Sequence, residues 1–80
     1  MVHKTAGEIR ETLSIRLRAL RKEQRYSRAQ LGACTEMHRN TILMIEQGKA
    51  DVRVGTIERL AQVLGTNMSY LMGYTQDRRP

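Results

Sequence analysis

Hydrophobic residues recur along the first third of the chain at the spacing of an amphipathic helix. Thr5 and Glu8 stand three residues apart, which is the spacing of a capping box at a helix start. Apolar residues then follow on one helical face, so we expect a helix from about Ala6 to Gln24. The positions on its buried face are Ile9, Leu13, Leu17 and Leu20.

The rest of the chain carries the signals of four shorter helices. Ser27 and Gln30 repeat the capping-box spacing. Gly48 and Gly65 follow apolar runs, as residues that end helices do, and Asn67 can cap a last short helix. From Tyr74 onward the tail lacks apolar anchors and is expected to be frayed. The expected helices span about Ser27 to Cys34, His38 to Gln47, Val54 to Leu64, and Met68 to Met72.

Composition favours an all-α fold in one domain. Aromatic residues make up 4% of the 80 residues, with no Phe or Trp, and the apolar residues are mostly Leu, Ile and Met. Strands are therefore poorly signalled. A chain of this length buries only about 60% of its unfolded surface, so local helix packing or a partner subunit would help its stability.

The charge of the chain points to a polyanionic partner. Lys and Arg number 14 against 8 acidic residues, which gives a net charge of +6 and an isoelectric point near 10.3. Such an excess is typical of nucleic-acid binding, although charge alone also fits a merely soluble basic surface. The placement of the cations has to decide between these two interpretations.

Other classes of function find little support in the sequence. The single cysteine, Cys34, has no partner for an internal disulfide, and with only two histidines no metal-ligand spacing exists, so we expect a cytoplasmic chain without a metal. No signal peptide or 18-residue apolar run is present, so no membrane association is expected. No catalytic set or glycine-rich phosphate loop occurs, and we therefore expect neither an enzyme nor a cofactor.

The third predicted helix has two chemically different sides. On a helical wheel, Ile42 and Ile45 fall together with His38. The residues of the second side are Arg39, Asn40, Leu43, Met44 and Gln47. In the major groove Arg pairs with guanine, Asn pairs with adenine, and apolar side chains contact the thymine methyl group, so this side is suited to reading bases. The alternative is that the arginine and the asparagine are simply solvated and the hydrophobic residues pack elsewhere.

The segment Tyr26 to Lys49, YSRAQLGACTEMHRNTILMIEQGK, resembles the helix-turn-helix of the Cro/phage-repressor (XRE) family. Gly32 stands where the family has a small residue at the helix crossing, and Thr41 to Gly48 matches its run before the loop. A later match, Thr56 to Gly65, extends the resemblance to roughly Leu13 to Leu71.

The resemblance implies a five-helix, lambda-repressor-like DNA-binding domain over residues 13–72. Residues 1–12 form an N-terminal extension with the start of the first helix, and residues 73–80 form a tail. Four positions depart from the family pattern. Glu36 replaces a residue that tolerates left-handed backbone in the turn, and His38 replaces the usual serine cap of the third helix. Arg25 replaces a common glycine and Val52 a common proline, so we expect the turn to be slightly reshaped and the two flanking loops to differ.

The roles implied by the resemblance fall into three groups. Base edges would be read by Arg39, Asn40, Leu43 and Met44. Phosphates would be contacted by Arg28, Gln47 and Lys49, with Arg53 a weaker candidate. Arg21 would form an ion pair with Glu46 that orients the reading helix, unless it is only a loose surface contact.

We therefore expect a homodimeric transcription regulator, a repressor or controller protein, that binds a double-stranded DNA operator. Apolar side chains near the end of the chain would form the dimer interface. One alternative is an antitoxin that also masks a toxin partner through the same surface, and another is an interaction module without DNA binding. The expected interface residues are Tyr70, Leu71, Met72 and Tyr74.

Overall fold

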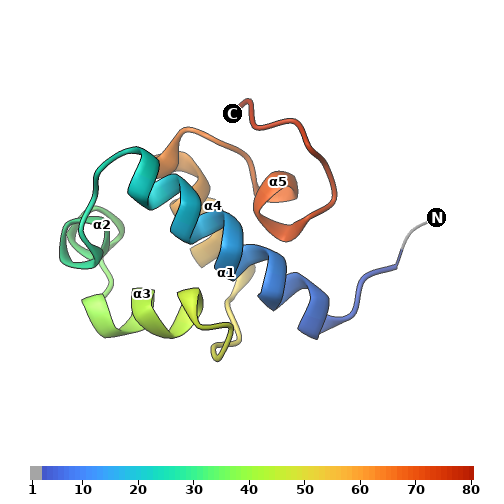
Figure 1. Cartoon of the computed structure of the whole chain (residues 1–80), viewed down its shortest axis with the longest axis horizontal. Coiled ribbons are helices and arrows are strands. Elements are labelled where there is room, and N and C mark those ends of the chain that lie inside the picture. The colour runs from blue at the N-terminus through green and yellow to red at the C-terminus, as the bar shows by residue number, and fades with distance from the viewer. Residues whose placement is uncertain (1–2) are drawn as a thin grey trace.

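The computed structural model describes residues 3–80 and confirms the all-α prediction, with five helices and no strand in that range (Figure 1). The long helix α1 crosses the middle of the molecule in front of α4, while α2 and α3 lie along its left and lower sides. The C-terminal tail loops over the top beside α5. The helices are α1 (Ala6–Glu23), α2 (Arg28–Thr35), α3 (Arg39–Glu46), α4 (Val54–Leu64) and α5 (Met68–Met72).

Side-chain caps that the sequence predicts define the starts of α1, α2 and α5. Thr5 accepts a hydrogen bond from the Glu8 amide of α1, and the Glu8 carboxylate accepts one from the Thr5 amide. These hydrogen bonds with the Thr5 backbone and side chain lower the pKa of Glu8. Ser27 and Gln30 form the same reciprocal box at α2, and Asn67 caps α5. The capping signals in the sequence therefore predicted real helix starts.

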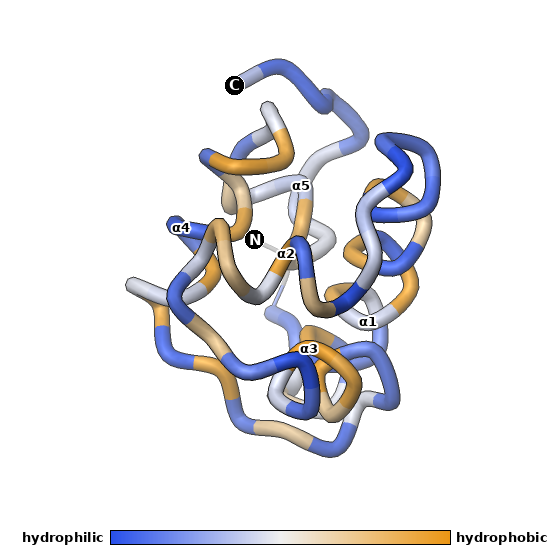
Figure 2. The backbone as a smooth tube through the Cα atoms, turned by 90° about the vertical axis from the view of Figure 1, so that its left-hand side faces the viewer, coloured by the Kyte–Doolittle hydropathy of each residue, from blue (hydrophilic) through white to orange (hydrophobic). Residues whose placement is uncertain are grey.

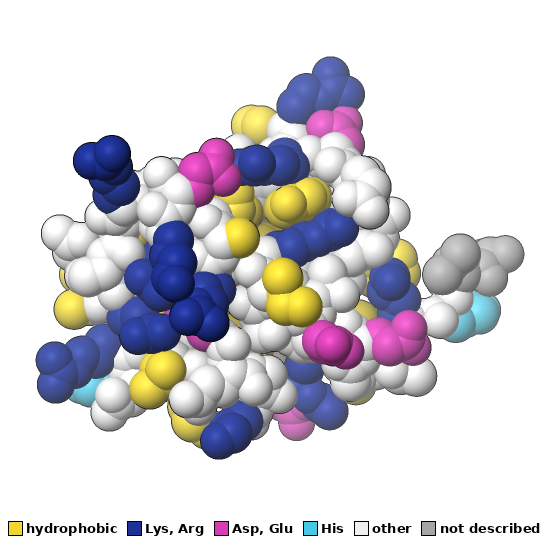
Figure 3. Space-filling model, in the orientation of Figure 1, with side chains coloured by type: hydrophobic (Ala, Val, Ile, Leu, Met, Phe, Trp, Pro, Cys, Tyr) yellow, Lys and Arg dark blue, Asp and Glu magenta, His cyan; other side chains and the backbone are white. Residues whose placement is uncertain are grey.

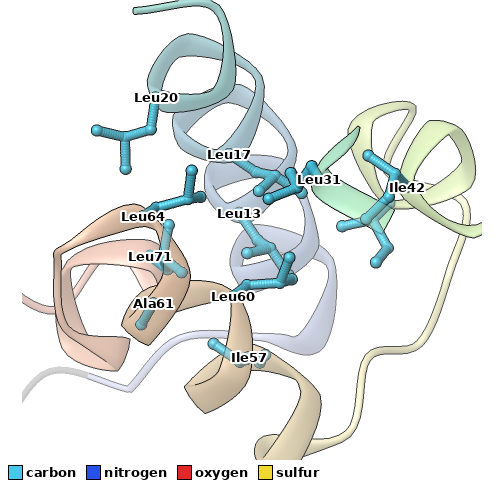
Figure 4. Close-up of a cluster of buried hydrophobic side chains, with 11 residues drawn as sticks. Leu13, Leu17, Leu20, Leu31, Ile42, Ile57, Leu60, Ala61, Leu64 and Leu71 are labelled. Carbon is cyan, nitrogen blue, oxygen red and sulfur yellow. The ribbon is translucent and has the colours of Figure 1, made fainter. Parts of the chain in front are cut away.

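One hydrophobic core holds the five helices together (Figure 4). Leu13 and Leu17 of α1 lie at its centre, with exposed fractions of 1% and 0%, and side chains from every other helix meet them. Burial of this kind stabilises the fold by about 1.5–3 kcal/mol for each large apolar side chain. The remaining members are Leu20, Leu31, Ile42, Ile45, Ile57, Leu60, Ala61, Leu64 and Leu71.

Two of the departures from the family pattern, Glu36 and Arg25, have left-handed backbone. Glu36, after α2, has φ 57° and ψ 38°, and Arg25, after α1, has φ 62°. Both residues therefore adopt the left-handed conformation that glycine occupies at low cost. The turn between α2 and α3 therefore carries local strain at Glu36.

The expectation of a frayed tail is wrong, because polar side chains of the domain hold residues 75–79. Arg16 of α1 donates hydrogen bonds to the carbonyls of Tyr70 and Thr75 at 2.5 and 2.8 Å. Asn67 donates to the carbonyls of Asp77 and Arg79. Backbone carbonyls do not need apolar side chains to be anchored, and for that reason the hydropathy pattern gave no sign of these contacts.

Candidate nucleic-acid interface

Helix α3 lies at the surface with one side buried in the core and the other exposed. Ile42 and Ile45 are 0% and 2% exposed and fix the inner side. His38 precedes the helix and its Nδ1 atom accepts a hydrogen bond from the Asn40 amide, which fixes the first turn. In Figure 2 the tube of α3 is hydrophilic at its first residues and hydrophobic over the run that follows. On the outer side Arg39, Asn40, Met44 and Gln47 are exposed, and Leu43 is half-buried.

Arg21 and Glu46 form a buried ion pair between α1 and α3. Arg21 Nε and Nη2 donate to the two carboxylate oxygens of Glu46 at 2.5 and 3.2 Å, and the side chains are 8% and 2% exposed. Arg21 Nη1 also donates to the carbonyl of Tyr26 in the loop before α2. This burial distinguishes the pair from a loose surface contact. One guanidinium therefore joins α1, α3 and the approach to α2.

The same carboxylate holds Arg28, the first residue of α2. Arg28 Nε donates to Glu46 Oε1 at 3.0 Å, while its side chain remains 37% exposed. Sequence reasoning placed Arg28 near phosphate but missed this contact, which joins residues 18 positions apart. Glu46 thus orients a half-exposed guanidinium beside α3 and leaves its terminal nitrogens without a hydrogen bond to the described residues.

The loop between α3 and α4 supplies further cations. Lys49 and Arg53 are exposed, and neither side chain forms a hydrogen bond or ion pair with residues 3–80. Arg10 of α1 pairs with Asp51 of the same loop, which ties the loop to the body of the domain. The loop therefore presents two free cations from an anchored backbone.

The residues expected at a dimer interface are in very different environments. Leu71 is 0% exposed because it belongs to the core, which corrects the expectation that it faces a partner. Tyr70 is half-buried under Arg16, whose guanidinium lies 4.2 Å from the ring centroid. Met72 is half-buried and lines an apolar hollow of about 230 Å³ between α1 and α4, and Tyr74 is 49% exposed. Only Met72 and Tyr74 of this group therefore present open apolar surface.

Two other kinds of site are absent from the part of the chain that the structure describes. Residues 3–80 contain no group of three or more His, Cys, Asp or Glu side chains placed to hold a metal ion. In the same range no helix is both long enough and apolar enough to cross a bilayer.

The model of the family described as "Helix-turn-helix domain" matches residues 12–68, which is well over half of the chain. The chain belongs to the helix-turn-helix domain family. In this helix-turn-helix domain the match covers α1 to the start of α5 and so includes the pair α2 and α3. Membership supports DNA binding and transcription regulation as the general function, and it confirms the resemblance drawn from the sequence.

Solved structures show the same fold. The crystal structure of the hypothetical transcription factor NHTF from Neisseria is similar with a TM-score of 0.78 at 20% identity, covering 85% of this chain and 76% of that one. The crystal structure of FeII HppE in complex with substrate is similar with a TM-score of 0.73 at 19% identity, covering 88% of this chain. This helix-turn-helix domain spans 45% of the HppE chain, so the likeness concerns part of that protein and its fold alone. No curated protein matches the chain significantly.

Proposed function

We propose that the protein is a sequence-specific, double-stranded DNA-binding regulator of transcription that reads base edges with α3. The observation that carries this proposal is the exposed side of α3, where the side chains of Arg39, Asn40 and Met44 form no hydrogen bond or ion pair with residues 3–80. A guanidinium, an amide and a thioether at the first two turns match guanine, adenine and the thymine methyl group respectively. Leu43, half-buried, would contribute apolar surface at the edge of this side.

Phosphate contacts would surround the reading helix. Arg28 is held by Glu46 beside the last turn of α3, and the exposed Gln47, Lys49 and Arg53 lie at the end of α3 and in the loop after it. The first helix of a helix-turn-helix crosses the DNA backbone while the second enters the major groove. In that arrangement Arg28 faces one strand, and the loop cations face the other wall of the groove.

The test of base reading compares specific with scrambled DNA. A preferred sequence is first selected from a pool of random duplexes, and each variant is then titrated against that sequence and its scrambled form at several salt concentrations. Arg39→Ala and Asn40→Ala should each lose about 1–3 kcal/mol on the selected duplex and little on the scrambled one. Gln62→Ala, an exposed change on α4, is the matched control and should bind as the parent does. Equal losses on both duplexes would overturn base reading by these residues.

A homodimer is the second part of the proposal. Operators for this class of domain are commonly two half-sites one DNA turn, about 34 Å, apart. Met72, Tyr74 and the hollow beside Met72 supply open apolar surface at one side of the domain, and apolar surface of this kind marks interfaces. Sedimentation equilibrium at micromolar concentration should detect a dimer that Tyr74→Asp and Met72→Asp weaken. Ile15→Asp, at a residue 62% exposed on α1, should leave it intact. A parent that is monomeric both alone and on a symmetric site would overturn the dimer.

A further inference from the structure

The cations of this domain divide into two groups when their partners are compared. Eight of the fourteen Lys and Arg side chains contact another described residue through a hydrogen bond, an ion pair or a stacked aromatic ring, and six do not. Three of the six are Arg39, Lys49 and Arg53, which lie on α3 and the loop that follows it. The other three lie on or just after α1, and they are Arg18, Lys22 and Arg25.

These last three residues form one ridge, called here the α1 ridge. Arg18 and Lys22 are four residues apart and exposed on the same side of α1, and Arg25 follows just beyond the end of the helix. Arg21, three residues after Arg18, binds Glu46 of α3, so this part of α1 packs directly beside α3. The α1 ridge therefore adjoins the proposed reading helix and does not lie on a remote surface.

The surroundings of the α1 ridge add to its positive charge. Its neighbour is the cluster of Arg21, Arg28 and Glu46, in which two guanidinium groups share one carboxylate and leave a net charge of +1. In Figure 3, Lys and Arg side chains gather on the left, over the end of α1, over α2 and over the start of α3. Like charges held together without partners repel one another, so the arrangement is suited to an anionic ligand.

We propose that the α1 ridge is a second DNA-contacting surface, which binds the phosphates of the strand that passes the start of α2. The proposal rests on the proposed function and extends it from α2 and α3 to α1. A helix-turn-helix places its first helix across the sugar-phosphate backbone, and α1 ends beside the start of that helix. A strand that contacts Arg28 then continues past Arg25, Lys22 and Arg18. The ridge reads no bases, because phosphates are the same at every sequence.

Removal of the ridge charges tests this proposal on a 25-base-pair duplex of mixed sequence. The variant Arg18→Gln/Lys22→Gln/Arg25→Gln should weaken binding on every sequence alike. It should also flatten the slope of log affinity against log salt by about two to three units, since each phosphate contact contributes about 0.9. All three side chains are exposed, so the variant should melt as the parent does.

The matched control lowers the net charge by the same amount at sites away from the ridge. Lys4→Glu/Gln62→Glu has the same net charge of +3, because the first change removes two charge units and the second removes one, and it alters the N-terminal segment and an exposed position of α4. Its salt slope should stay within about half a unit of the parent's, because a distant charge makes no phosphate contact. Equal flattening by both variants would show a general charge effect and overturn the α1 ridge.

The two proposals fail in different ways. A parent that binds no duplex overturns the proposed function, and the ridge proposal falls with it. A parent that binds DNA and loses specificity with Arg39→Ala, but keeps its salt slope when the α1 ridge is neutralised, retains the proposed function and overturns the ridge alone. In that case the alternative ligand of the ridge is an acidic protein. A binding assay that compares the parent with the triple variant would detect such a partner.

Discussion

Gly32 of α2 lies directly against the backbone carbonyl of Met37, so that a Cβ atom at Gly32 would come within 2.3 Å of that oxygen. Real Cβ atoms do not approach a carbonyl so closely, and a backbone atom cannot rotate away as a side chain can. The crossing of α2 and α3 therefore requires glycine for space, although its conformation is ordinary helix.

Gly32→Ala should destabilise the domain by about 1–3 kcal/mol or more, because α2 and α3 would have to move apart. Urea unfolding followed by circular dichroism measures this change. Gly55→Ala is the control, since nothing lies within 4 Å of its added Cβ in α4. That control should gain about 0.5–1 kcal/mol from the better helix propensity of alanine. Unfolding of Gly32→Ala at the parent's urea concentration would contradict the close approach.

The left-handed residue between α2 and α3 leads to a second prediction. Glu36→Gly should stabilise the domain by up to about 1 kcal/mol, because the strain of φ 57° exceeds the added chain entropy of glycine. Ala33→Gly places the same residue in the exposed middle of α2 and should instead cost about 1 kcal/mol. The melting temperatures of the two variants should therefore shift in opposite directions. A shift of both in the same direction would contradict backbone strain at Glu36.

The shared carboxylate of Glu46 separates a structural arginine from an exposed one. Arg21→Ala should cost about 3–5 kcal/mol of stability, since it leaves a buried carboxylate with only Arg28 as partner. Arg28→Ala, at the exposed member, should cost less than about 1 kcal/mol. If Arg28 contacts phosphate, it should still weaken DNA binding on all sequences and flatten the salt slope by about one unit. Denaturant unfolding measures the loss of stability in each variant, and salt titration measures its DNA binding. An equal loss of stability in both variants would show that the burial of Arg21 does not make it the more important partner of Glu46.

The contact between α1 and the tail can be tested through Arg16. Arg16→Ala removes hydrogen bonds to two carbonyls and the stacking on Tyr70, with an expected loss of about 1–3 kcal/mol. Arg16→Lys should restore little, because an ammonium group lacks the planar fork that reaches both oxygens. Arg78→Ala breaks only an exposed pair with Glu23 and should change stability by less than about 1 kcal/mol. Faster amide exchange at residues 75–79 in Arg16→Ala, but not in Arg78→Ala, would confirm that Arg16 anchors the tail.

Local signals explain why the helix boundaries were predictable from the sequence. The caps at Thr5, Ser27 and Asn67 act within three residues of themselves, and the predicted ranges of α4 and α5 agree with the structure. The two sides of α3 followed from its helical period in the same way. Spacing along a helix thus gave both the element and its exposed side.

Long-range polar contacts explain what the sequence did not predict. The link from Arg28 to Glu46 and the hold of Arg16 on the tail depend on how separate helices pack, which no periodicity reports. Leu71 was assigned to a partner because a helix of five residues is too short to show which side faces inward. The α1 ridge is distinguished by side chains without partners among residues 3–80, and this property depends on which contacts the other arginines form.

The tail ends on the side of the molecule opposite α3 (Figure 1). A fluorescent reporter or a surface tether joined after Pro80 would therefore project away from α3. Immobilised by such a tether, the domain would present α3 to solution for measuring association and dissociation rates. A fusion at this point should leave those rates unchanged, so the position of the tail makes single-molecule study of this domain practical.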